Sequence, residues 1–426
     1  MPLLLIEPHD ALIVRDGRAF DPTPGARASS LTFPMPSTLA GAVRTQLGTR
    51  ADGSFDETQL QLLLDTEIRG PLLAEAGAAG AWQLMAHAPA DALLLADRIN
   101  DNLVLRKQLV PITQPAGLGV DPAFPTGDGG YALIGPRQHS PAKPLANAPR
   151  FWYWHQLEAW LMRNGAEQDD MWLKQPEAGQ HAARPTLAAL GHQGPESEQR
   201  THVGIQPTTQ TADEGMLFQT RGLEFRQQRS LPQAGGHLTE RLRLGLVVAV
   251  EHPPQPLKSK VATLGGERRL AHWTLNPQQC ALPKLSPNLV DKIVKARGDT
   301  HYCRIILLTP AYFAKGWRPT WLCEPQDAVT PALIGAAVGR TQVASGWDLK
   351  LREPKPSRRL APAGSVFFLK LSGRPDAVRD WVTKRWLSCV SDDTQARSDG
   401  FGLAVVGAWS GALAEMKLEA DYAKGA

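Results

Sequence analysis

The segment from residue 13 to residue 47 holds cations, a hydroxyl and a bare backbone that could bind an anion together. Arg15 and Arg18 flank an Asp-Gly turn, so the turn would present two guanidinium groups side by side. Ser37, Gly41 and Arg44 follow at i, i+4 and i+7, which forms one stripe of a helix near its N-terminus. Such a surface suits a phosphate. The alternative is structural: Gly41 would only allow close packing, and Arg44 would point into solvent.

The same segment limits the helix that would carry this stripe. Pro34 and Pro36 disfavour helical backbone before them, and Ser37 or Thr38 can then cap the helix. Apolar residues that recur every four positions form the stripe that we expect to be buried: Leu39, Val43 and Leu47.

A second glycine-rich segment, DGFGLAVVG from Asp399, enters an apolar run near the C-terminus. It lacks the dinucleotide-binding pattern, because Val405 stands where the third glycine belongs, and no Gly-Lys-Ser/Thr follows as in a P-loop. Gly400 and Gly402 would let another backbone approach closely and would face it with bare N–H groups. The alternative is a β-bulge at the start of a strand.

Two clusters of cations lie in long loops of the C-terminal half. The first contains Lys258, Lys260, Arg268 and Arg269. The second contains Lys350, Arg352, Lys355, Arg358 and Arg359. Prolines keep the second cluster extended, so its charges cannot neutralise one another along a helix, and Trp347 beside it offers a stacking surface. These clusters either bind phosphates or form solvated loops.

The segment from Thr201 to Phe225 predicts an extended β-hairpin. Val203 and Ile205 alternate with polar residues, and Met216 resumes a strand pattern after a polar tip. A plain surface excursion is the alternative.

The exact order of residues in these segments is more informative than their charge and polarity alone. RDGRAF followed by PSTLAGAVRT resembles the opening of the RAMP superfamily of CRISPR proteins, and within it the third subunit of the Cmr (type III-B) effector complex. Further likenesses are THVGIQPTTQTADEGMLF, GWDLKLREPKPSRRLAPAGSVFF and DGFGLAVVG. These stretches follow one another in family order over nearly the whole chain, so the resemblance covers its full length.

The resemblance implies roles for the segments. The glycine-rich loop at Gly400 and Gly402 would bind guide RNA. The hairpin would be a thumb that reaches over the RNA and displaces a nucleotide, with Met216 or Ile205 as the wedge. His202 could stack on a base or hydrogen-bond to it.

The resemblance also implies partners. The chain would grip the 5′ repeat-derived handle of the guide crRNA. It would dock the large polymerase/cyclase-like subunit on one side and the first backbone RAMP subunit on the other, and would meet target RNA indirectly.

The pattern of apolar residues predicts an α+β fold of two tandem ferredoxin-like (RRM-like, βαββαβ) modules, residues 1–235 and 236–426, with long loop insertions. In the second module we expect strands at 240–250, from Tyr302, from Ser365 and from Phe401, and helices from Ser286 and Pro375. In the first we expect strands at 3–6, 82–85, 93–96, 103–110 and 218–225, and helices from Ser37 and at 151–165.

Composition favours a cytoplasmic protein that does not enter membranes. No apolar run approaches the roughly 20 residues of a membrane span. The 4 cysteines form no CxxC pair and predict buried thiols in a reducing cytosol. The net charge of +4 is compatible with nucleic acid without proving it. No motif calls for a metal or cofactor.

We therefore expect a non-catalytic RNA-binding subunit of a type III-B ribonucleoprotein. The alternative is an enzyme, a metal-independent RAMP endoribonuclease that processes CRISPR RNA with a histidine general acid/base, although the 11 histidines form no HxxxH, HxH or HxD pair. A scaffold that meets only protein is a third reading.

Overall fold

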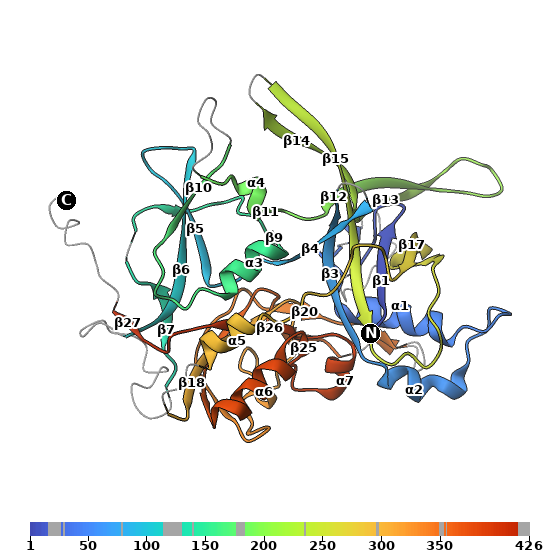
Figure 1. Cartoon of the computed structure of the whole chain (residues 1–426). Helices are drawn as coiled ribbons and strands as arrows, with labels where there is room; N and C mark the ends of the chain where they lie inside the picture. The colour runs from blue at the N-terminus through green and yellow to red at the C-terminus, as the bar shows by residue number, and fades with distance from the viewer. Residues whose placement is uncertain are drawn as a thin grey trace.

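The computed structural model describes residues 1–15, 27–28, 30–77, 80–113, 130–138, 140–175, 184–233, 236–294, 298–348, 353–354 and 356–415. In this part the chain is a strand-rich mixed α/β protein with few helices (Figure 1). None of the helices described there is long and apolar enough to cross a membrane.

The central sheet, at the right of Figure 1, carries the N-terminal strand in its interior. Its strand order is β11 (Gly191–His192), β9 (Phe151–Tyr153), β4 (Trp82–His87), β3 (Ile68–Ala76), β15 (Gly236–Val250), β1 (Leu3–Pro8), β17 (Leu270–Leu275) and β16 (Lys260–Thr263). A further strand, β14 (Arg226–Gln233), pairs with β15. Helix α1 (Pro36–Gly48) joins β1 to β3, and β15 lies between those strands, antiparallel to both. This arrangement is a split β-α-β unit.

The predicted buried stripe of α1 is confirmed. Leu39, Val43 and Leu47 are buried in one apolar cluster with residues of β1 and β15, among them Leu4 and Val248. These contacts remove the apolar face of the helix from water and hold α1 on one face of the central sheet.

The second sheet, at the bottom of Figure 1, is built by the C-terminal half. Its order is β19 (Thr330–Ala337), β24 (Val366–Ser372), β18 (Thr300–Leu307), β26 (Leu403–Ala408) and β25 (Ser388–Cys389). Helix α6 (Pro375–Arg385) joins β24 to β26 with β18 between them, which is a second split unit. Helix α5 (Pro287–Ile293) packs beside α6 on this sheet.

The third sheet, at the left of Figure 1, is an insertion between β4 and β9 extended by later strands. Its strands are β10 (Asp170–Leu173), β6 (Leu103–Thr113), β5 (Ala92–Ala96), β8 (Lys143–Pro144), β7 (Leu133–Pro136) and β27 (Ala414–Glu415). Helix α3 (Trp154–Leu161) packs against β4, β9 and β26, and α4 (Leu187–Leu190) packs against β9 and β11.

Smaller elements complete the fold. A long hairpin is formed by β12 (Glu196–Ile205) and β13 (Ala212–Glu224), with β2 (Arg27–Ala28) beside β13. Two short hairpins are β20 (Gln342–Ala344) with β23 (Arg358–Leu360), and β21 (Trp347–Asp348) with β22 (Glu353–Pro354). The other helices among the described residues are α2 (Leu60–Asp65), α7 (Thr394–Ser398) and the 3-10 turns η1 (Glu57–Gln59), η3 (Gly266–Arg268) and η4 (Trp321–Cys323).

Several expected strands lie in other sheets than the sequence suggested. The strand at 240–250, expected to open the second module, is part of β15 and pairs with β1 and β3. The strands expected at 93–96 and 103–110 form the third sheet. The strand expected at 218–225 lies mostly in β13 of the hairpin. The helix expected from Phe151 starts only at Trp154, because Phe151–Tyr153 pairs as β9.

A buried polar junction fixes the sheets relative to one another. Arg304 of β18 forms an ion pair with Asp91, and both side chains are fully buried. Trp160 of α3 donates its Nε1–H to Asp91 at 2.9 Å, and Arg304 also donates to the backbone oxygen of Arg163 at 3.0 Å. Because a buried charge is tolerated only when its partners are in place, this junction ties the second sheet to the insertion and to α3.

Candidate nucleic-acid interface

Three segments that the sequence singled out meet at the junction of the central and second sheets. Met35 before α1, Leu360 of β23 and Phe401 of the glycine loop share one small apolar cluster. Tyr312 packs against the same cluster. The glycine loop is further tied to the segment after β18, because Gly402 N–H donates to the Pro310 carbonyl at 2.8 Å. Residues more than 300 positions apart thus pack into one buried cluster.

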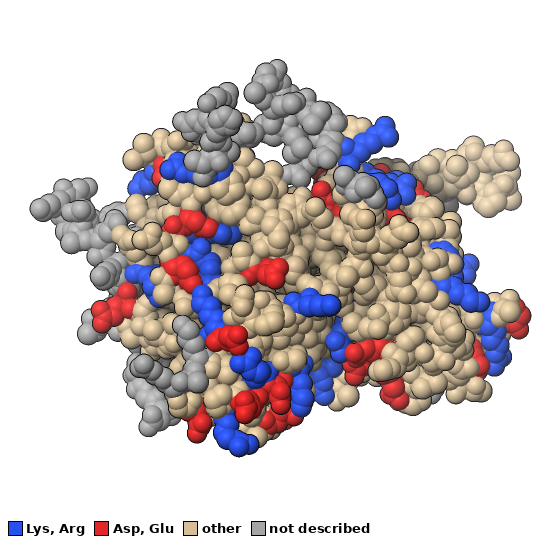
Figure 2. Space-filling view, viewed as in Figure 1, with Lys and Arg blue, Asp and Glu red and all other residues tan. Residues whose placement is uncertain are grey.

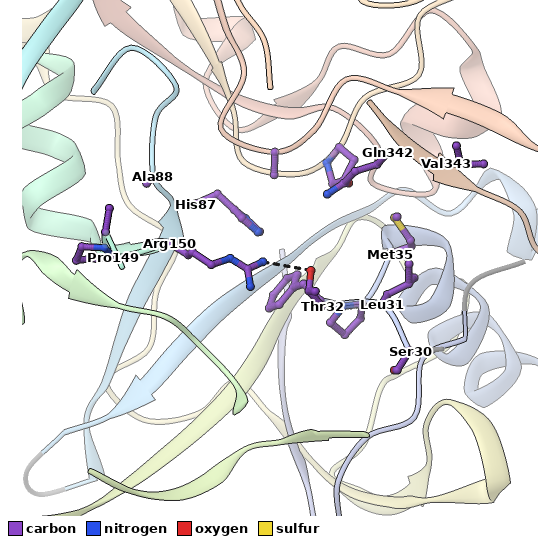
Figure 3. Close-up of a pocket in the computed structure, with 15 residues that line it drawn as sticks. Ser30, Leu31, Thr32, Met35, His87, Ala88, Pro149, Arg150, Gln342 and Val343 are labelled. Atoms are coloured by element: carbon purple, nitrogen blue, oxygen red, sulfur yellow. Dashed lines mark hydrogen bonds between the residues drawn. The ribbon is translucent and has the colours of Figure 1, made fainter. Parts of the chain in front are cut away.

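A pocket of about 570 Å³ opens at this junction (Figure 3). Its walls come from residues 30–35 before α1, 87–88 at the end of β4, 148–150 before β9, Pro310, 342–343 of β20 and Ala363. None of these positions stood out by spacing in the sequence, apart from the neighbourhood of 30–35 to the predicted helix start.

The pocket combines aromatic and polar groups. Arg150 donates from Nη2 to Oγ1 of Thr32 at 3.2 Å. The rings of Phe33, His87 and Phe151 lie together, with centroids 4.4 Å apart for His87 and Phe151 and 5.2 Å apart for Phe33 and His87. Gln342 points across the pocket toward His87 (Figure 3). The walls therefore offer flat faces together with hydrogen-bonding groups.

The protein surroundings set the charges in this pocket. Desolvation, followed by the charge of Arg150, lowers the pKa of His87 to about 3, so its imidazole is neutral at neutral pH. A neutral imidazole has one donor and one acceptor nitrogen. Desolvation also lowers the pKa of Arg150, but a guanidinium remains a cation at any physiological pH.

Helix α1 differs from its expected start. Pro36 is its first residue and Met35 its N-cap, without a side-chain cap bond, so the expected capping by Ser37 or Thr38 is wrong. The side chains of Ser37 and Thr38 are half-buried in the first turn. Gly41 is exposed, and a Cβ placed there would meet no other atom within 4 Å. The side of α1 around Gly41 is therefore an open surface.

Arg44 lies inside the protein, which corrects the expectation that it would point outward. It forms an ion pair with Asp399. Its Nη2 donates to the carbonyls of Leu64 and Thr66, both at 3.1 Å, and to that of Ser398 at 3.2 Å. The guanidinium thus holds α1, α2 and the glycine loop together, and a role in phosphate binding remains a prediction.

The glycines of the C-terminal loop face their own chain. Gly400 has φ +93°, and a Cβ there would lie 2.7 Å from the Gly70 carbonyl oxygen. Gly402 has φ +80°, and its Cβ would lie 2.8 Å from the Ser391 amide nitrogen. Internal packing and left-handed backbone explain both glycines. The approach of guide RNA to this loop remains a prediction.

The described cations of the second basic cluster lie on β23. Arg358 stacks over the Tyr312 ring, 4.6 Å from its centroid, and lies 3.5 Å from a carboxylate oxygen of Asp393. Arg359 is exposed, and no ion pair to it occurs among the described residues. Lys350, Arg352 and Lys355 lie outside the described residues, as does the side chain of Trp347.

The first basic cluster lies beside the N-terminal segment at the other edge of the central sheet. Gly266 N–H donates to the Ile13 carbonyl at 2.7 Å, which places this loop next to the segment that leads to Arg15. Cations exposed here are Arg15, Lys258, Lys260 and Arg268. Arg269 is half-buried and lies 2.9 Å from Glu267. Arg18 lies outside the described residues.

The predicted hairpin is confirmed as β12 and β13, which extend away from the body at the right of Figure 1. Exposed apolar side chains gather on one of its faces, since Val203 is 48%, Ile205 60% and Leu217 57% exposed. His202 on the opposite face stacks on Phe218 and hydrogen-bonds with Thr220 Oγ1 at 2.8 Å. The side chain of Met216 lies outside the described residues, and the sequence did not single out Leu217.

The surface drawn in Figure 2 carries no continuous basic field over the described residues. Cations and carboxylates alternate across its left and lower parts. Binding of a polyanion to this face would therefore depend on local groups of cations rather than on the mean charge. Among the described residues, no three His, Cys, Asp or Glu side chains gather in a way that could hold a metal ion.

A family model described as "CRISPR-associated protein (Cas_Cmr3)" matches residues 4–409. The chain belongs to the Cmr3 family of CRISPR-associated proteins. The predicted resemblance is thus confirmed over nearly the whole length. No curated protein matches the chain.

Solved structures similar to this Cmr3-family chain include two from one kind of assembly. One is a chain of the "Type III-B Cmr-beta bound to cognate target RNA and AMPPnP, state 1", with 14% identity and a TM-score of 0.39, covering 89% of this chain and 87% of the other. The second is from "Type III-B Cmr-beta bound to cognate target RNA", with 15% identity and a TM-score of 0.40, covering 86% of each chain.

Proposed function

We propose that this chain is a non-catalytic RNA-binding subunit of a type III-B CRISPR ribonucleoprotein, and that it holds the 5′ handle of the guide crRNA. Membership of the Cmr3 family supports the assignment to such a complex. The observation that carries the RNA role is the meeting of the pre-α1 segment, the glycine loop and β23 in one apolar cluster, beside a pocket that the pre-α1 segment and β20 help to line.

The mechanism would be positioning. Phosphate contacts from exposed cations such as Arg359 would set the register of the guide. These contacts would not distinguish one base from another, because every nucleotide carries the same phosphate. The open side of α1 at Gly41 would let the RNA backbone approach closely. The apolar face of the β12–β13 hairpin would act as a wedge, with Ile205 and Leu217 entering between bases that have been pushed apart.

The partners belong to the same proposal. The large polymerase/cyclase-like subunit and the first backbone RAMP subunit would dock on opposite sides, in the cytoplasm. Each of the two main sheets holds one split β-α-β unit, which supports two tandem ferredoxin-like modules. The proposed division at 235/236 falls at the tip of the β14–β15 hairpin, with β15 completing the central sheet.

The competing function is a histidine-dependent endoribonuclease. His202, the histidine on the hairpin, already hydrogen-bonds Thr220 and stacks on Phe218. A general acid/base must reach the group whose proton it transfers, and these contacts hold the ring against its own sheet instead. This arrangement favours a binding role for the hairpin.

The experiment that tests the proposal is crosslinking in the assembled complex. Guide RNA carrying 4-thiouridine in its handle should crosslink to this chain on irradiation, and repeat RNA incubated with the purified chain should be bound but not cut. Crosslinks confined to other subunits would leave a protein-only scaffold. Cleavage that disappears in His202→Ala would establish the nuclease instead.

A further inference from the structure

The pocket at the sheet junction has the size and the lining of a small-ligand site. Its volume of about 570 Å³ lies within the range of roughly 300–1,000 Å³ typical of such sites. Phe33 and the neutral ring of His87 supply flat faces. Stacking on such faces is how proteins hold the unpaired bases of single-stranded RNA.

Two polar side chains of the pocket have hydrogen-bonding atoms without a partner among the described residues. Arg150 is partly desolvated but still reaches solvent, donates one bond to Thr32, and has no carboxylate partner among the described residues. Its remaining N–H groups can receive a phosphate or a base oxygen. The side-chain oxygen of Gln342 accepts no hydrogen bond within the described chain, and because it is shielded from solvent the amide must rotate to bring this oxygen to a ligand. A glutamine amide offers one donor and one acceptor, the pattern that reads the edge of a base.

We propose that this pocket holds one base of the guide RNA that has left the stack of its neighbours, with the Gln342 amide at the edge of that base and Arg150 at its backbone. The inference rests on the proposed function and names the subsite where a nucleotide is read. An amino-acid side chain from a partner subunit is the competing occupant. A cation with free donors beside an amide and two flat rings favours the nucleotide.

The test is a substitution at the rim of the pocket that fills it with a large side chain. Val343 lines the pocket on β20 and is 56% exposed, so Val343→Trp can block the pocket without entering the core. Val261→Trp is the matched control, because Val261 is 51% exposed on β16 at the edge of the central sheet. Guide RNAs in which one handle nucleotide at a time is abasic are then titrated against the full-length wild-type and variant proteins.

For the wild type, one abasic position should weaken binding by roughly 5- to 150-fold, the range for losing one stacked base. Val343→Trp should weaken binding of intact guide by a similar factor, and the same abasic position should then make no further difference. Val261→Trp should behave as wild type. Gln342→Ala provides a second route, since it should reduce discrimination among the four bases at that position alone.

Four results would overturn the inference. Equal abasic effects in wild type and Val343→Trp would show that no base enters the pocket, while RNA binding itself would stand. Loss of partner-subunit binding by Val343→Trp, with RNA binding intact, would assign the pocket to a protein side chain. If Gln342→Ala distinguishes the four bases at that position as well as the wild type does, Gln342 does not recognise the base. A wild-type chain that binds no guide would overturn the proposed function as well.

Discussion

Arg44 of α1 forms an ion pair with Asp399 of the glycine loop, across 355 positions of sequence. Their side chains are 10% and 15% exposed, so water screens this pair poorly. The pair joins the start of the chain to its last core strand, because Asp399 lies a few residues before β26. Two motifs that the sequence suggested as separate RNA contacts thus depend on each other for their position.

Removing the cation should therefore destabilise the fold. In Arg44→Met, Asp399 would keep a largely buried and unpaired charge, and we expect a loss of about 3 kcal/mol, the lower end for a broken buried pair. Urea denaturation would measure it. Adding Asp399→Asn should restore part of the loss, because the orphaned charge disappears. A single variant with an unchanged midpoint and full RNA binding would show that the pair contributes nothing to stability.

Two glycines should respond in opposite ways to a side chain. Gly402→Val should destabilise the protein by more than about 2 kcal/mol, since φ is +80° and the Cβ would press on Ser391. Gly41→Ala should stabilise it by about 0.5–1 kcal/mol, as for a helical glycine with open space around it.

A second substitution at Gly41 distinguishes an effect on folding from an effect on RNA binding. A large residue in Gly41→Leu should weaken guide binding while leaving the melting temperature unchanged or raised, if the open side of α1 faces RNA. Thermal melts and filter binding on the same samples would check this. Tight binding by Gly41→Leu would mean that RNA does not approach α1.

Local sequence patterns predict the helices and strands better than they predict which strands pair in a sheet. The pattern of apolar residues at 240–250 predicts a strand, and a strand forms there with Leu244 and Val248 buried. That this strand pairs with β1 and β3 could not be predicted, because the pattern shows which face is buried but not which sheet buries it. The sequence predicts a helix already from Phe151, because the apolar run of Phe151–Tyr153 continues into α3 without a break.

The site was harder to predict for the same reason. Glycine and arginine motifs marked segments that do meet, yet Thr32, His87, Arg150 and Gln342 are ordinary residues without any shared spacing. They come together only because β4, β20 and the segment before α1 end at one junction. A single sequence holds no signal for such a meeting, so the pocket emerges only with the fold.

The two adjacent arginines of β23 should differ in their contribution to RNA binding. Arg359→Ala should lower the slope of log affinity against log salt by roughly 0.7, as expected for one phosphate contact on single-stranded RNA. Arg358→Ala should lower it less, because Asp393 and Tyr312 already hold that guanidinium. Filter binding across a salt series would measure both slopes.

The matched control for this experiment is Arg379→Ala. Arg379 lies on α6, is exposed to the same 47% as Arg358, and is paired with Asp291. Its removal should leave the slope unchanged. The same decrease in all three variants would mean that only the mean charge of the protein matters, and that β23 holds no dedicated phosphate site.

His87 should make the stability of the protein depend on pH in mildly acidic solution. Its pKa falls from an ordinary 6.5 to about 3 in the folded chain, chiefly through desolvation. Between these values the unfolded chain binds a proton that the folded chain does not, so stability falls as the pH falls below 6.5. The largest slope from one such group is about 1.4 kcal/mol per pH unit.

His87→Gln removes this proton while keeping a polar side chain, so it should flatten the pH dependence. Between pH 7 and pH 5 the wild type should lose about 1–2 kcal/mol more than the variant in urea denaturation. Carboxylates with lowered pKa values, such as Asp56 and Asp327, also weaken the fold in acid, but they are common to both proteins and cancel in the difference. His9→Gln, which alters an exposed histidine, should follow the wild type. Parallel curves for wild type and His87→Gln would mean that the native pocket accepts the proton, and His87 would then offer a base a second donor instead of an acceptor.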